Sequence, residues 1–120
     1  MINELVKEIH SKNIEAGWWN DPITGKDLRD DPYVIATKLL LVISEISEAT
    51  EAFRKDLMDD KLPHRKGVEV EISDAMIRLC DLAGALNLDV EGAIGEKRAY
   101  NSKREDHQVQ NRVKEGGKKF

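Results

Sequence analysis

Residues 33–57 read YVIATKLLLVISEISEATEAFRKDL, and this stretch decides the fold. Its apolar residues recur at the three- and four-residue spacing of an amphipathic helix. Glu45 and Glu48 are i,i+3 neighbours, and both fall within the apolar stripe rather than opposite it. A buried carboxylate needs a cation or a proton to offset the cost of leaving water. The stretch therefore predicts a helix from about Tyr33 to Leu57 that presents carboxylates toward the interior.

The rest of the chain also has a helical pattern, with no alternating run of strand-like length. A first helix is predicted from about Asn3 to Ala16, ended by Gly17, and residues 18–32 carry turn residues. Further helices are predicted from about Val68 to Leu86 and from about Asp89 to Arg104. Four helices with short connections favour an all-α fold, an antiparallel four-helix bundle.

Length and composition indicate one domain over residues 1–120 of this 120-residue chain. No apolar run approaches the length that spans a bilayer, so we expect no membrane partner. The single cysteine, Cys80, fits a reducing, cytoplasmic location. The net charge of −4 argues against a nucleic acid polymer as partner. Residues 97–120 nevertheless hold eight basic and three acidic residues, and we expect residues 107–120 to form a flexible basic tail.

A second acidic pair follows the first at a spacing that suits a helical hairpin. Glu71-Ile-Ser-Asp74 repeats the arrangement of Glu45 and Glu48, and 22 residues separate Glu48 from Glu71. That interval is long enough to finish one helix, turn, and begin an antiparallel one. Four carboxylates without histidine or cysteine favour a hard cation, Mg²⁺ first and Mn²⁺ as a substitute. The alternative is that helices rich in glutamate carry solvated acids.

These motifs resemble those of the MazG-like, all-α nucleoside triphosphate pyrophosphohydrolases. Residues 45–48 and 71–74 resemble the ExxE…ExxD signature of that family, and residues 96–104 resemble its KxxxNxxR segment. The His-to-Gly-Trp-Trp stretch over residues 10–19 and the Gly-Gly-Lys-Lys sequence at 116–119 are similar to short, single-domain members from phages and mobile elements. The resemblance covers nearly the whole chain.

The resemblance implies Mg²⁺-dependent hydrolysis of a nucleoside triphosphate, expected to be a deoxynucleotide, to the monophosphate and pyrophosphate. It also implies a four-helix unit that forms a homodimer or homotetramer, with sites lined by more than one subunit. The alternative is a non-catalytic helical module with a regulatory or interaction role. The sequence leaves the preferred base and sugar open.

The resemblance also assigns roles to individual residues. Some family members carry a second glutamate where this chain has Ser44, so Glu45 or Glu48 is expected to orient the water itself. The implied metal ligands are Glu45, Glu48, Glu71 and Asp74, and the residues implied to contact phosphates, sugar or base are Lys97, Asn101 and Arg104. The last three lie at i, i+4 and i+7, one helix face, which an ordinary solvated basic face would also explain.

Three further residues near the start of the chain are candidates for substrate binding. Trp18 and Trp19 are adjacent and point in different directions, so we expect one to pack in the core and the other to stack on a nucleobase. Lys38 lies two turns before Glu45 and is expected either to meet a phosphate or to form a structural salt bridge. His10 is expected to be solvated or to cap a helix, and the alternative is a contact with the sugar or base.

Overall fold

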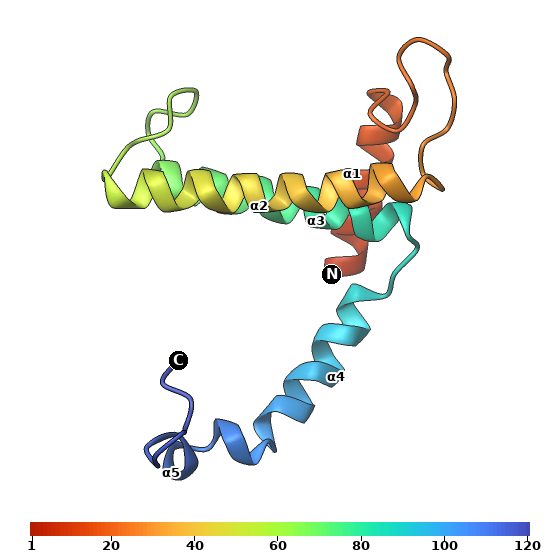
Figure 1. Cartoon of the computed structure of the whole chain (residues 1–120). Coiled ribbons are helices and arrows are strands. Elements are labelled where there is room, and N and C mark those ends of the chain that lie inside the picture. Colours follow the sequence, from red (N-terminus) through yellow and green to blue (C-terminus); the bar gives the residue numbers. More distant parts are fainter. The chain divides into compact units, whose positions relative to one another are not determined.

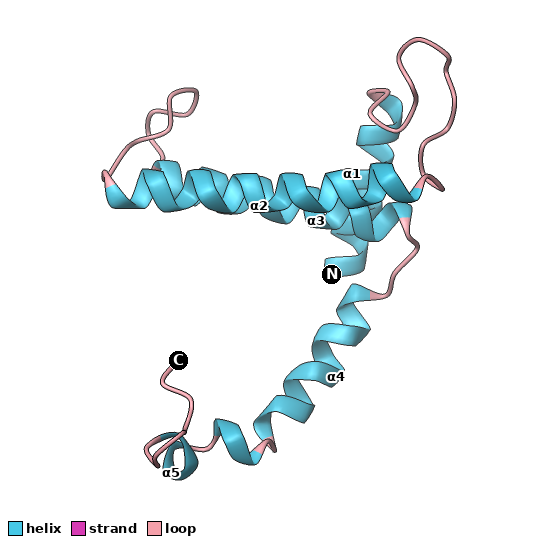
Figure 2. Ribbon diagram, viewed as in Figure 1, coloured by secondary structure: helices cyan, strands magenta, loops and turns pink.

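The computed structural model describes residues 1–120, and its secondary structure is helical apart from two isolated β-bridges (Figures 1 and 2). The all-α prediction is confirmed. No helix combines the length and the apolar character needed to cross a membrane. The elements are α1 (Ile2–Glu15), α2 (Pro32–Arg54), α3 (Gly67–Ala85), α4 (Val90–Ser102), the 3₁₀ helix η1 (Glu105–His107) and α5 (Val109–Arg112).

The chain divides into two compact units, Met1–Leu88 and Asp89–Phe120. In the first unit, α2 and α3 form an antiparallel helical hairpin, and α1 packs across α3 (Figure 1). The second unit consists of α4, η1 and α5. The expected four-helix bundle within one domain depends on how these units combine, and it stays a prediction.

Local chemistry sets the helix boundaries. Asp31 begins α2 by accepting hydrogen bonds from the backbone N–H groups of the next turn, and Pro32 occupies the first helical position. Each helix of the first unit is followed by a residue with positive φ, and the backbone N–H groups of that residue and of the next one donate to carbonyl oxygens of the last turn. These residues are Gly17, which was predicted, and Asp56 and Asn87, which were not. Because of Asp56, α2 ends three residues before the predicted Leu57.

The core of the first unit is small and centres on one tryptophan. Trp19 is 1% exposed and packs with Val42 of α2 and with Ala75 and Leu82 of α3. Since the 17–31 connection starts beside α1, burial of Trp19 anchors that loop on the helical hairpin. The expectation that one tryptophan belongs to the core is met by Trp19, whereas Trp18 is 67% exposed.

A buried polar network ties α1 to this core. Asp81 of α3 accepts a hydrogen bond from Trp19 Nε1 at 2.8 Å, and its same oxygen lies 2.8 Å from His10 Nδ1. The prediction that His10 is solvated or caps a helix was wrong, because His10 is buried against Asp81 and the Trp19 ring. The close approach of α1 and α3 requires Gly84, where a Cβ atom would lie 2.4 Å from the Cβ of His10.

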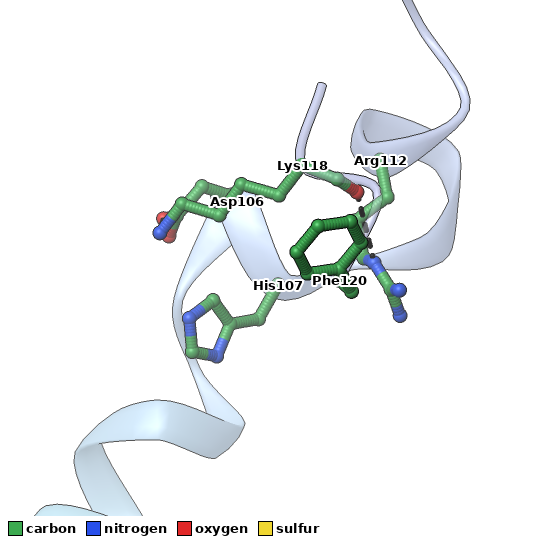
Figure 3. A pocket seen from close by; sticks show the side chains of 5 residues that line it. All are labelled: Asp106, His107, Arg112, Lys118 and Phe120. Atoms are coloured by element: carbon green, nitrogen blue, oxygen red, sulfur yellow. Dashed lines mark hydrogen bonds and ion pairs between the residues drawn. The ribbon is translucent and has the colours of Figure 1, made fainter. Parts of the chain in front are cut away.

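The second unit is held together by charged side chains. Asp89 begins α4 by accepting from the backbone N–H of Gly92 at 2.9 Å. Asp106 pairs with Arg104 and with Lys118, both at 2.8 Å, so the end of the chain lies against η1. Figure 3 shows the side chains around a pocket of about 260 Å³ at this place, including Phe120. The predicted flexibility of residues 107–120 concerns motion and stays a prediction.

Candidate metal centre

The helical hairpin brings the two acidic pairs together. Glu45 lies on the buried face of α2 with Val42 and Ala49, as its position in the apolar stripe predicted. Carboxylate oxygens of Glu45, Glu71 and Asp74 lie within 4.8 Å of one another, a group that could hold a metal ion. Three of the four predicted ligands therefore converge on one point.

The fourth predicted ligand, Glu48, lies beside this group at the surface. Its side chain is exposed, so the prediction that both acids of α2 face the interior holds for Glu45 and was wrong for Glu48. Glu48 lines the same cavity as the other three acids. Glu48 and Glu71 are close enough to form a carboxyl–carboxyl hydrogen bond. Glu48 is therefore placed at the mouth of the acidic group rather than in its centre.

An open cavity of about 770 Å³ lies over these acids, between α2, α3 and the 55–66 connection. Seven of the residues that line it are acidic, and one, Lys61, is basic. The volume exceeds what a single hydrated cation needs and is within the range of small-molecule sites. The cavity can therefore admit a ligand together with a cation.

The carboxyl groups affect one another's protonation. Burial, followed by hydrogen bonds and repulsion involving Glu45 and Glu48, raises the pKa of Glu71 from 4.5 to about 7. Burial also raises the pKa of Asp74, with a further contribution from the charge of Glu45. Below about pH 7 the metal-free site therefore favours a proton on Glu71, and a cation would take the place of that proton.

Arg78 neutralises the most buried of the acids. Its Nε donates to Glu45 Oε1 at 2.8 Å. Burial alone would raise the pKa of Glu45, but the hydrogen bond and charge of Arg78, together with hydrogen bonds from Glu71 and Glu48, outweigh burial and lower that pKa. Sequence analysis missed this partner, although Arg78 follows Asp74 by four residues and so shares its helix face.

A second cavity of about 460 Å³ adjoins the acidic group on its other side. Glu45 and Asp74 line both cavities, so the carboxylates form the wall between them. The second cavity is also lined by Trp18, Lys38 and Arg78. It combines an exposed aromatic ring, two cations, three acids and apolar residues, a mixture that suits a flat, polar ligand group.

Lys38 is placed by Trp19 rather than by an acid. Its Nζ lies 4.3 Å from the centroid of the Trp19 ring and 3.5 Å from the backbone oxygen of Trp18. Lys38 forms no salt bridge in the structure, so that one of its two expected roles is wrong. The ammonium group instead makes a cation–π contact at the edge of the second cavity.

The candidates Lys97 and Asn101 lie on α4, whereas Arg104 follows it, because α4 ends at Ser102 and not at Arg104 as predicted. All three belong to the second unit. Arg104 pairs with Asp106, and Lys97 Nζ lies 4.9 Å from the centroid of the Tyr100 ring. The side-chain oxygen of Asn101 is buried without a hydrogen-bond partner. Comparison of the chain with protein-family models, curated proteins and solved structures found no match.

Proposed function

We propose that this protein hydrolyses a nucleoside triphosphate, preferably a deoxynucleotide, to the monophosphate and pyrophosphate in a Mg²⁺-dependent reaction. The observation that carries the proposal is the convergence of carboxylate oxygens of Glu45, Glu71 and Asp74 within 4.8 Å at the cavity of about 770 Å³. Glu45 and Asp74 also line the cavity of about 460 Å³. The all-oxygen donor set fits Mg²⁺, with Mn²⁺ as a substitute. The raised pKa of Glu71 supports the same view, because burial beside Glu45 and Glu48 disfavours an ionised form that a bound cation would stabilise.

Phosphoryl transfer depends mainly on positioning and on neutralising charge. When bound, Mg²⁺ supplies charge neutralisation at phosphate oxygens and lowers the pKa of water. In the proposed arrangement the triphosphate lies in the cavity of about 770 Å³ and the base lies in the cavity of about 460 Å³, on Trp18. Lys38 and Arg78 then provide positive charge beside the nucleoside.

Glu48 is the proposed residue that orients the attacking water. Ser44, where some members of the resembled family carry a glutamate, donates its hydroxyl to the backbone oxygen of Leu41 at 2.6 Å. The Ser44 hydroxyl is therefore engaged by the backbone of α2, whereas the Glu48 side chain is exposed and lines the cavity. Glu45 is less suited to this step because it is buried and bonded to Arg78.

The proposal also includes a four-helix unit that associates as a homodimer or homotetramer. Large apolar side chains are exposed along α2, where Leu40 is 64%, Ile43 57% and Phe53 75% exposed, and along α3, where Ile72 and Met76 are more than half exposed. Large apolar side chains exposed in this number are typical of an interface. We propose that a second copy covers it, and that Lys97, Asn101 and Arg104 contact substrate in the assembled unit. Light scattering that reports a monomer with full turnover would contradict this part.

The decisive assay measures products from a panel of common and modified nucleoside triphosphates with Mg²⁺. We expect pyrophosphate and a monophosphate, and a loss of at least about 100-fold in rate for Glu48→Gln and Glu71→Gln. Glu8→Gln, an exposed change on α1, serves as the control and should keep wild-type turnover. A nucleoside diphosphate as the end product, or wild-type turnover in either site variant, would refute the assignment.

A non-catalytic regulatory or interaction module is the second candidate. The ion pair between Arg78 and Glu45 favours it, because a scaffold without metal would need such a partner for a buried acid. Thermal melting separates the two candidates. A ligand at 100 times its Kd stabilises a protein by about 2.7 kcal/mol, so an active enzyme should melt higher with Mg²⁺ and nucleotide. No shift with any nucleotide would favour the module.

A further inference from the structure

We propose that Lys61 binds the outer phosphates of the substrate in the acidic cavity, a role that rests on the function proposed above. Lys61 is the one basic residue among those that line this cavity, and seven acidic residues line it. It lies in the connection between α2 and α3, outside every motif that sequence analysis singled out. A lysine ammonium is a common point-charge contact for phosphate.

The backbone around Lys61 is fixed by local hydrogen bonds. The Asp59 carboxylate accepts from the backbone N–H groups of Lys61 at 3.0 Å and of Leu62 at 2.7 Å. The Asp59 N–H in turn donates to the backbone oxygen of Arg65 at 2.9 Å, and Met58 forms a β-bridge with Lys66. The side chain of Lys61 therefore extends from a defined point at the rim of the cavity.

Lys61 also differs from its basic neighbours in having no acidic partner. The other three basic side chains of this region are engaged, Lys55 with Glu51 at 3.2 Å, Arg65 with Glu69 at 3.1 Å and Lys66 with Asp56 at 4.0 Å. Lys61 forms no ion pair, although its charge acts on Asp74. Its ammonium group is thus available to a ligand that enters the cavity.

The excess of acidic residues around the cavity explains why a positive charge at Lys61 would matter for binding a phosphate. A triphosphate is strongly anionic, and the carboxylates around it would repel it unless cations offset both sets of charge. Mg²⁺ bound to the acids would supply part of that charge. Lys61 supplies a fixed positive charge at the rim, where it would meet the phosphates farthest from the nucleoside.

The experiment compares Lys61→Ala and Lys61→Arg with Lys26→Ala. Lys26 is an exposed lysine of the 17–31 loop and lines neither cavity, so its removal changes the net charge equally. Two quantities are measured, the KM for a deoxynucleoside triphosphate and the Kd for inorganic tripolyphosphate with Mg²⁺ in excess. We expect Lys61→Ala to raise both by about tenfold or more. Lys61→Arg should keep most of the affinity, and Lys26→Ala should match the wild type.

The outcomes distinguish this inference from the proposed function. An active wild type with unchanged KM and Kd in Lys61→Ala would overturn the role of Lys61 and leave the function intact. Equal losses in Lys61→Ala and Lys26→Ala would also overturn it, because they would reflect overall charge. Tripolyphosphate binding that depends on Lys61, without nucleotide hydrolysis, would support the phosphate contact and refute the function. Melting curves of each variant establish that the fold is retained.

Discussion

Replacing Glu71 with glutamine removes a carboxyl group whose pKa is about 7 instead of 4.5. When Glu71 is ionised and no metal is bound, this pKa shift corresponds to a destabilisation of the folded protein by at most roughly 3 kcal/mol. Glu71 is only partly buried, and solvent screening reduces the expected effect to about 1 kcal/mol. The variant should therefore melt about 4 °C higher than the wild type at pH 8 in the presence of a chelator.

The pH dependence follows from the direction of the shift. Because the folded-state pKa of Glu71 lies above its unfolded value, its stabilising contribution is fully present below pH 4.5 and is lost as the pH rises through about 7. The melting temperatures of Glu71→Gln and wild type should therefore converge at low pH and separate between these two values. Mg²⁺ at pH 8 should raise the melting temperature of the wild type more than that of the variant.

Calorimetric melting at a series of pH values, with and without Mg²⁺, measures this difference. Glu69→Gln is the matched control, since Glu69 lies on the same helix but is exposed and paired with Arg65. A control that separates from the wild type as far as Glu71→Gln does would show a general effect of lost charge rather than an effect of the site. A Glu71→Gln protein that melts lower than wild type at pH 8, or a difference that is constant with pH, would refute the electrostatic account of the site.

Two further predictions concern the first unit. Gly84→Ala should destabilise the protein by about 1–3 kcal/mol in urea unfolding, since the new Cβ would lie 2.4 Å from the Cβ of His10; an unchanged midpoint would show that α1 is not docked as described. Trp18→Ala should leave stability within about 0.5 kcal/mol but raise the KM for nucleotide, whereas Trp19→Phe should cost about 1–3 kcal/mol because Asp81 loses the indole N–H and keeps only its contact with His10. Equal stability losses in the two tryptophan variants would contradict their different burial.

Periodicity in the sequence was enough to place the four long helices and the buried orientation of Glu45. The end of α2 was not predictable in the same way, because Asp56 takes the positive φ that usually marks a glycine. Burial of Trp19 rather than Trp18 depends on the path of a loop, which has no periodicity. The partner of Glu45 was missed because Arg78 lies on a helix face with both polar and apolar residues. Only the packing of α2 against that face brings Arg78 to Glu45.

The buried contact between His10 and Asp81 could not be predicted from the sequence either. His10 and Asp81 are 71 residues apart, and nothing local in the sequence indicates that they meet. Each residue alone is typical of a solvated surface, and only the packing of α1 on α3 makes the pair buried. The place of Lys61 at the cavity likewise follows from the Asp59 turn, which sequence analysis treated only as a connection.

The four acids of the proposed site all belong to the single hairpin of α2 and α3, and this has a consequence for folding kinetics. Only the short 55–66 connection must close to bring them together, so the entropic cost of their encounter is small. Contacts between such near neighbours in sequence form early in folding. The negatively charged side chains therefore meet before distant elements such as α1 have docked. Protonation or a divalent cation will then increase the folding rate of the chain as well as its final stability.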